Sequence, residues 1–218
     1  KILIGPFKYG QKDDYNAAKY WEDRYKKYGS SLLGPGDESV SEEENKDSYI
    51  KAGLAFKELC KNENIDFENM NILEIGVGNG FYTGIFKELG TKHLTGLDIA
   101  DTLFDSFREK FPDYKFIKKD LTKDEIGDKF DFITMVDVAQ HIVKKEKLQA
   151  ALENIKNSLS ENGIFFIAPL VEKSKRELYY VHVWSKDDII ENFEGFDIKS
   201  DIVFRNNQGL IIRKKGKQ

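Results

Sequence analysis

The sequence predicts an α/β fold: a seven-stranded, mostly parallel sheet with an antiparallel last strand, helices on both faces and a helical N-terminal lid. Two observations predict it. From residue 70 onward, short apolar runs alternate with helical patterns, which is typical of a parallel sheet covered on both faces. Only residues 205–209 separate the last two apolar runs, so these runs should pair antiparallel as a hairpin.

Length and composition fit one domain with an N-terminal extension. The chain has 218 residues, and a domain of that size buries roughly 70% of the surface that its unfolded chain exposes. We expect residues 1–45 to form a helical extension or lid, and residues 46–218 to form the main domain. The chain has 34 basic and 38 acidic residues, a net charge of -4, which disfavours a large nucleic-acid surface.

Cysteine content and apolar runs indicate the expected setting. Cys60 is the only cysteine, so no internal disulfide can form and a reducing, cytoplasmic setting is expected. No apolar run approaches the ~20 residues of a membrane span, so no membrane partner is expected. The sequence indicates no particular oligomeric state.

Two helices are expected before the first strand. Residues 13–28 have an aromatic-rich helical pattern, and the glycines and proline of residues 29–36 end it. A second helix is expected from Glu42 to Cys60, because acidic residues in a first turn favour the helix dipole.

The remaining elements alternate as the fold class requires. The expected strands are Asn71–Ile75, His93–Leu97, Tyr114–Ile117, Phe130–Val136, Gly163–Ala168, Phe196–Phe204 and Leu210–Ile212. The expected helices are Tyr82–Leu89, Thr102–Lys110, Lys145–Leu159 and Lys186–Phe193.

The first of these strands runs into a glycine loop. Gly76, Gly78 and Gly80 follow the strand at alternate positions, and a helix follows at once. Glycines let the backbone approach a ligand closely, and a helix N-terminus offers unpaired N–H groups. A dinucleotide site would need Gly or Ala at position 81, where this chain has Phe81. Glu74, two residues before the first glycine, suits a ligand with a cationic end better than it suits a pyrophosphate.

Carboxylates end the next three strands at the edge where ligands bind in doubly wound sheets. Asp98 follows Gly80 by 18 residues and could accept both hydroxyls of a ribose. Asp120 could accept from an adenine amino group while Leu121 packs on the ring. The alternative for Asp120 is a local helix cap. Asp137 ends the fourth strand and Val138 follows it.

Together these residues resemble the class I, Rossmann-like methyltransferases that use S-adenosylmethionine (SAM). The resemblance covers about residues 70–214. It rests on E-x-G-x-G-x-G at Glu74–Gly80, Asp98 after the second strand, and Asp120 after the third. It rests further on VDVAQHI at residues 136–142, NSLSENGIFFI at residues 157–167, and the terminal hairpin.

The resemblance implies SAM as cofactor, S-adenosylhomocysteine (SAH) as product, and a set of binding residues. The three glycines would frame the methionine part, and Asp98 would take the ribose. Asp120 and Leu121 would hold the adenine, and Asp137 or Val138 would form the wall beside the sulfonium. The complete expected set is Trp21, Arg24, Glu74, Gly76, Gly78, Gly80, Asp98, Ile99, Asp120, Leu121, Asp137 and Val138.

The N-terminal stretch around Trp21 and Arg24 resembles the lid of many members that act on small molecules. There the two side chains could cover SAM and contact its carboxylate. The alternative is an ordinary amphipathic helix packed on the domain.

Histidines are the candidates for a base or a substrate contact, because the pKa of histidine lies near neutral pH. His141 follows the fourth strand, and His182 lies after the fifth, where such enzymes usually bind substrate. His93 starts a strand at the opposite end of the sheet and is expected to be structural. Asp137 and His141 are four residues apart, but no third ligand has a recognisable spacing, so no metal site is expected.

The leading functional hypothesis is transfer of a methyl group to a small polar metabolite or glycan precursor. Oxygen is the favoured acceptor atom, and the sequence leaves nitrogen and carbon open. The aromatic lid and the Tyr179–Trp184 segment suggest a closed pocket, and basic residues are dispersed. The alternatives are a protein or RNA methyltransferase, and a module that holds SAM without catalysis. An NAD-dependent oxidoreductase is a further alternative, which Phe81 and Glu74 weaken.

Overall fold

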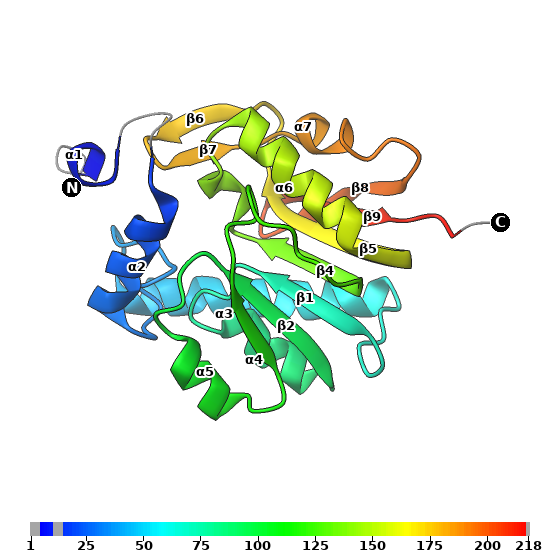
Figure 1. Cartoon of the computed structure of the whole chain (residues 1–218), viewed down its shortest axis with the longest axis horizontal. Coiled ribbons are helices and arrows are strands. Elements are labelled where there is room, and N and C mark those ends of the chain that lie inside the picture. The colour runs from blue at the N-terminus through cyan, green and yellow to red at the C-terminus, as the bar shows by residue number, and fades with distance from the viewer. Residues whose placement is uncertain (1–4, 11–14, 217–218) are drawn as a thin grey trace.

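The computed structural model of the chain has a single central sheet, described for residues 5–10 and 15–216 (Figure 1). Its seven strands lie in the order β3-β2-β1-β4-β5-β9-β8, and β9 alone runs antiparallel to its neighbours. The strands are β1 Asn71–Ile75, β2 His93–Asp98, β3 Lys115–Lys118, β4 Phe130–Val136, β5 Leu159–Leu170, β8 Asp197–Phe204 and β9 Asn207–Arg213. The predicted mostly parallel sheet is therefore confirmed.

The central strands of this sheet consist mainly of apolar residues, because helices cover both faces of the sheet and bury them. β1 and β4 are buried along almost their whole length, and Ile72 of β1 lies in register with Leu94 of β2 and Phe132 of β4. At the centre, therefore, only the ends of the strands are left to meet a ligand.

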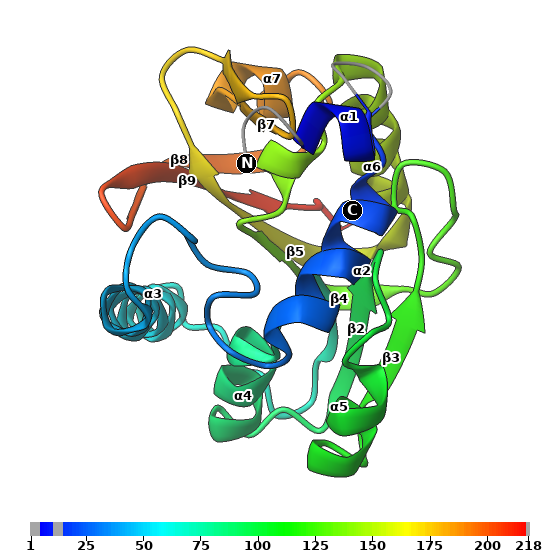
Figure 2. The same cartoon turned by 90° about the vertical axis from the view of Figure 1, so that its left-hand side faces the viewer.

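Helices cover both faces of the sheet (Figure 2). The residues on each face form a separate apolar cluster. One face carries α3 Glu42–Asn62, α4 Phe81–Glu88 and α5 Phe104–Lys110, whose aromatic residues form one cluster. The other face carries α6 Lys145–Ser158 and α7 Lys186–Ile190. None of the described helices is long and apolar enough to cross a membrane.

The N-terminal lid consists of α1 Gly5–Tyr9, α2 Ala17–Tyr28 and residues 29–41. Asn16 caps α2 by accepting a hydrogen bond from the Lys19 amide at 3.0 Å, so the expected helix starts later than residue 13. Residues 11–14 lie outside the described part of the chain. α3 begins at Glu42 after a capping box between Ser41 and Glu44, so a division between residues 45 and 46 falls inside its first turn.

Three parts of the fold differ from the prediction. Residues expected to be a substrate-binding segment form a separate two-stranded hairpin, β6 Lys175–Leu178 and β7 Val181–Val183. A short 3₁₀-helix, η2 Ala139–His141, follows β4. The turn between β8 and β9 consists of Arg205 and Asn206 alone, because both adopt positive φ (52° and 63°), as a type I′ turn requires.

Candidate active site

The glycine loop between β1 and α4 needs glycine at its first position for two reasons. Gly76 has φ +79°, and a Cβ there would lie 2.2 Å from Cγ2 of Val138. Gly78 has φ +60°, and the Tyr25 hydroxyl and Pro35 of the lid lie 3.6 Å from the position of its Cβ. The loop therefore lies between the segment after β4 and the lid: Val138 excludes a side chain at Gly76, whereas at Gly78 the positive φ, and not a clash with the lid, favours glycine.

A first cavity of about 480 Å³ opens at this loop, at the carboxyl edge of the sheet. That volume lies within the range of small-molecule sites. Most of the predicted cofactor residues line it, namely Trp21, Gly76, Gly78, Asp98, Ile99, Asp120, Leu121, Asp137 and Val138. The sequence therefore identified one continuous cavity, although its residues come from four strand ends and the lid.

Asp98 connects the end of β2 to the glycine loop. Its Oδ2 accepts a hydrogen bond from the Gly78 amide and its Oδ1 accepts one from the Ala100 amide, both at 3.0 Å. Burial raises the pKa of Asp98 to about 6, and these backbone hydrogen bonds oppose the rise. Each carboxylate oxygen keeps a further lone pair that a ligand hydroxyl could use.

Asp120 lies at the first cavity and also makes the local turn that was the alternative for it. In that turn, Oδ1 accepts from the Thr122 amide at 3.0 Å and from the Thr122 hydroxyl at 2.7 Å. Burial alone would raise the pKa of Asp120, but Lys123 and Thr122 outweigh it and lower the pKa. Leu121 beside it is buried and presents an apolar surface to the cavity.

Two residues of the loop motif do not reach the cavity wall. Gly80 caps α4 with φ +81°, and the position of its Cβ lies 3.0 Å from the Phe107 ring. Glu74 is 2% exposed and accepts a hydrogen bond from the Thr83 hydroxyl at 2.6 Å. Burial raises its pKa to about 8, and the Thr83 hydrogen bond lowers it only in part. The expected direct contact of Glu74 with a ligand is replaced by a position beneath the loop, between β1 and α4.

Asp137 lies where the first cavity meets a second one. Its φ of +59° lies in the left-handed region, which Asp adopts more readily than most residues other than glycine. Its Oδ1 pairs with the Nη2 of Arg205, in the β8–β9 turn, at 2.5 Å. Arg205 was not among the predicted site residues. The signal available was a cation in a hairpin turn at the carboxyl edge of the sheet.

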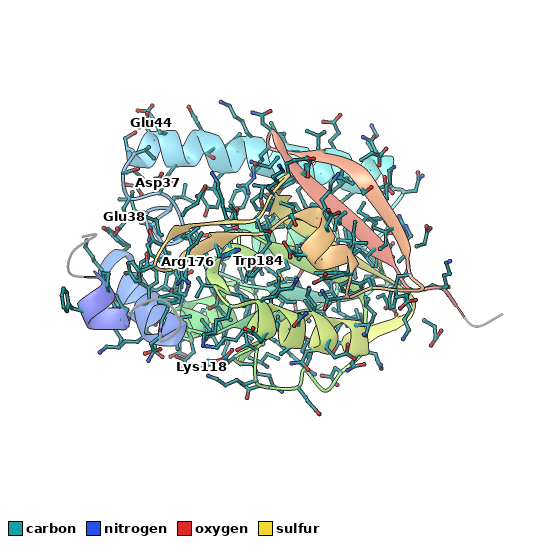
Figure 3. The ribbon with its side chains drawn as sticks, turned by 90° about the horizontal axis from the view of Figure 1, so that it is seen from above. Asp37, Glu38, Glu44, Lys118, Arg176 and Trp184 are labelled. Atoms are coloured by element: carbon teal, nitrogen blue, oxygen red, sulfur yellow. The ribbon has the colours of Figure 1, made fainter. Side chains whose placement is uncertain are left out.

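The second cavity has a volume of about 1610 Å³ and lies between the lid, the β6–β7 hairpin and the β8–β9 turn. It shares Trp21, Tyr49, Asp137 and His141 with the first cavity. Figure 3 labels Asp37 and Glu38, in the segment before α3, and Arg176, on β6, all of which line it. Two adjoining cavities that share one wall can hold two reactants side by side.

Arg24 stabilises the lid and lines only the second cavity, which corrects its predicted position over the first. Its guanidinium donates to the backbone oxygens of Leu33 (3.1 Å), Gly34 and Gly36, and to the Tyr20 hydroxyl at 2.7 Å. These bonds hold the 33–36 segment against α2. They engage four of the five N–H groups of the guanidinium, so a ligand carboxylate could reach only the second N–H of Nη1 without displacing one of them.

His141 has one ring nitrogen fixed by the hairpin. Its Nδ1 lies 3.2 Å from the backbone oxygen of Tyr180, and because a carbonyl only accepts, Nδ1 must carry the proton. Nε2 is then left with a free lone pair. Burial lowers the pKa of His141 to about 4, so the ring is neutral at pH 7. Trp21 meets the ring edge to face at 4.9 Å between centroids.

His182 is not at either cavity. It lies in β7, lines neither cavity, and stacks on Trp184 with the ring centroids 3.9 Å apart. The formation of the β6–β7 hairpin explains the difference, because the turn brings Tyr179 and Tyr180 to the second cavity and leaves His182 against Trp184. The predicted catalytic role of His182 therefore has no support in its position.

Residues 72–163 match the family model described as a methyltransferase domain. The matched segment starts in β1 and ends in β5, so it contains the glycine loop, Asp98, Asp120 and His141. Within the described ranges, no group of at least three His, Cys, Asp or Glu side chains could hold a metal ion.

A curated relative is the ribosomal protein L11 methyltransferase of Dictyoglomus turgidum, 28% identical over 110 residues. The alignment covers 49% of this chain and 34% of the relative, so the chain spans about a third of that protein's length.

Two solved structures share the fold over most of the chain. Magnesium protoporphyrin IX methyltransferase (ChlM) from Synechocystis PCC 6803, with bound SAH, has a TM-score of 0.65 at 16% identity and covers 91% of this chain and 98% of its own. SAM-bound CalS10, an amino pentose methyltransferase from Micromonospora echinaspora, has a TM-score of 0.59 at 13% identity. The match covers 77% of this chain and 92% of the CalS10 chain. At these identities the likeness establishes a common fold.

Proposed function

We propose that this chain, which carries a methyltransferase domain with the class I, Rossmann-like fold, transfers a methyl group from SAM to an oxygen of a small polar metabolite or glycan precursor. The observation that carries the proposal is the pair of adjoining cavities that share Trp21, Asp137 and His141. One cavity has the residues for the cofactor, and the other offers room for an acceptor beside it.

The residues of the first cavity fit SAM. Gly76 and Gly78 line the cavity with bare backbone, beside which the methionine part would lie. Asp98 and Ile99 would hold the ribose, and Asp120 with Leu121 the adenine. When bound there, SAM supplies a sulfonium methyl group for in-line displacement. The solved structures with bound SAM or SAH support this assignment through their common fold.

The chain's own contribution would be to align the reactants and exclude water. Positioning of this kind can supply about 7–11 kcal/mol of a barrier. Asp137 and Val138 form the wall between cofactor and acceptor, and Trp21 closes the site from the lid. The acceptor would enter from the second cavity with its nucleophilic oxygen directed toward that wall.

His141 would orient the acceptor through its free Nε2. With Nδ1 donating to Tyr180, Nε2 can accept a hydrogen bond from an acceptor hydroxyl and direct its lone pair toward the methyl group. A pKa near 4 makes His141 a weak base in the free protein, so its main role would be to position the hydroxyl, with proton transfer following as the oxygen loses electron density.

Calorimetric titration with SAM and SAH, with NAD as the control, tests the cofactor assignment. We expect micromolar affinity for the first two and no heat with NAD. Release of SAH across a panel of hydroxylated sugars and phosphorylated metabolites then tests the reaction. Binding of SAM without SAH release from any acceptor would favour a module that only holds the cofactor, and NAD binding would overturn the proposal.

A protein acceptor is the second candidate, because the curated relative is a ribosomal protein L11 methyltransferase. Incubation with radiolabelled SAM and ribosomal proteins would separate the two. Label in protein would favour this candidate, whereas label only in small molecules would favour the first.

A further inference from the structure

Arg205 is distinguished from the other arginines at the second cavity by its hydrogen bonding. The arginines that line this cavity are Arg24, Arg176 and Arg205. Arg24 donates to backbone oxygens of the lid, and Arg176 donates to the backbone oxygens of Leu178 (3.3 Å) and Tyr179 (2.8 Å). Both therefore have donors committed to local structure.

Arg205 has a buried donor without a partner. Its Nη2 pairs with Asp137, but its Nε is buried and has no hydrogen-bond partner among the described residues. The Phe204 ring lies 5.1 Å from its guanidinium carbon and fixes the group from one side. A buried donor that lacks a partner costs about 1–3 kcal/mol, so the free protein retains it at a cost that a bound acceptor atom would remove.

A second orphaned group lies beside the same ion pair. The Tyr82 hydroxyl is buried and, within the described part of the chain, also lacks a partner. The charges of Asp137 and Arg205 both influence the pKa of the Tyr82 and Tyr49 hydroxyls, Asp137 raising it and Arg205 lowering it. Tyr49 and Asp137 line both cavities, so this group of four lies at their junction.

We propose that Arg205 binds an oxyanion, a carboxylate or phosphate, carried by the methyl acceptor. The proposal rests on the proposed function and names the class of its substrate. A guanidinium presents planar pairs of N–H donors that match two oxygens of one oxyanion, which neutral acceptors match less well. Asp137 accepts from one N–H of Nη2, so an oxyanion on the Nε side would pair with Nε and with the second N–H of Nη2. The acceptor is then a hydroxylated acid or a phosphate ester whose anionic group lies close to the methylated oxygen.

The first test is anion binding to the SAH-saturated protein, measured calorimetrically with inorganic phosphate and with acetate as separate probes. We expect one of them to bind, and Arg205→Gln to weaken that binding by about tenfold to a hundredfold, the loss of a charged hydrogen bond. Arg205→Lys should restore part of it. Arg108→Gln, which removes the same charge from exposed α5, is the matched control and should bind as the wild type does.

SAH affinity, measured in the same variants, separates this proposal from the proposed function. If the wild type binds SAH but neither anion, or if Arg205→Gln binds the anion as the wild type does, the oxyanion role is wrong and the methyltransferase assignment stands. If the wild type does not bind SAH, the proposed function itself fails.

The second test compares paired acceptors, such as a sugar with its phosphate and a hydroxy acid with its amide. We expect SAH release only with the anionic member of a pair, and we expect Arg205→Gln to raise KM for that member far more than it lowers kcat. Which anion succeeds distinguishes a phosphate ester from a carboxylic acid. Equal turnover of neutral and anionic members would overturn the proposal.

Discussion

Replacing Asp98 by Asn should weaken SAH binding more than any other single change in the first cavity. The carboxylate already accepts from the Gly78 and Ala100 amides, and its remaining lone pairs are the ones available to ribose hydroxyls. The asparagine keeps one oxygen and turns an NH₂ group toward either an amide donor or a hydroxyl. Loss of hydrogen bonds to a charged acceptor costs about 1.5–3 kcal/mol each, so we expect Kd to rise about tenfold to several hundredfold.

The same substitution disturbs the glycine loop, so the assay must separate the two effects. Calorimetry of wild type and Asp98→Asn with SAH, and with an analogue that lacks both ribose hydroxyls, forms a double-mutant cycle. A ribose contact predicts a coupling of at least about 1 kcal/mol, whereas an effect through the loop alone predicts equal losses with both ligands.

The pH dependence of the wild type gives an independent check. The ionised carboxylate is the better acceptor, and the pKa of Asp98 in the free protein is about 6. Below that pH the group must lose a proton before it can accept fully, so Kd should rise by up to tenfold per pH unit. A coupling near zero together with an affinity that is constant from pH 7 to pH 5 would refute the ribose role.

Three further predictions concern the loop, its buried carboxylate and the lid. Gly76→Ala should lower the free energy of unfolding by about 2–5 kcal/mol, from the left-handed backbone and the clash with Val138. Gly84→Ala, in α4 with nothing within 4 Å of its Cβ, should be neutral or stabilising in the same denaturation assay. Because burial raises the pKa of Glu74 from 4.5 to about 8, the folded state keeps a proton there that the unfolded chain has released, and stability is lost as pH rises between these values. Urea unfolding from pH 7 to pH 8.5, above most of the titration of Asp98, should show this fall in wild type and a flatter profile in Glu74→Gln; equal slopes would contradict it. Arg24→Gln should lower the Tm, and it should weaken the binding of SAH and of its decarboxylated analogue to the same extent. A larger loss of affinity for SAH than for the analogue would instead support the predicted direct contact between Arg24 and the cofactor carboxylate.

The cofactor half of the site could be predicted from sequence because its signals are local. Each residue stands at the end of an apolar run, and parallel strands bring those ends to one edge of the sheet. Asp98, Leu121 and Val138 accordingly line one cavity, although no contact between them is visible in the chain. The sequence predicted correctly that Glu74 lies just before the glycine loop, but it did not predict that the side chain is buried away from the cavity. The motif fixes its position relative to the glycines, whereas its burial depends on the packing of α4 over β1.

The acceptor half could not be predicted, because its residues are brought together by turns and by packing between distant segments. Whether residues 175–183 form a loop or a hairpin decides if Tyr180 or His182 reaches the cavity, and an alternating pattern this short fits both. Arg205 reaches Asp137 only because the β8–β9 turn is two residues long, with both in the left-handed region. A longer turn would carry the guanidinium away from the edge of the sheet. The Asp137–Arg205 pair also connects the cofactor half of the site to the acceptor half, because Asp137 lines both cavities and Arg205 lines only the second. Substitutions at Asp137 should therefore alter cofactor and acceptor binding together, whereas substitutions at Arg205 should alter acceptor binding alone.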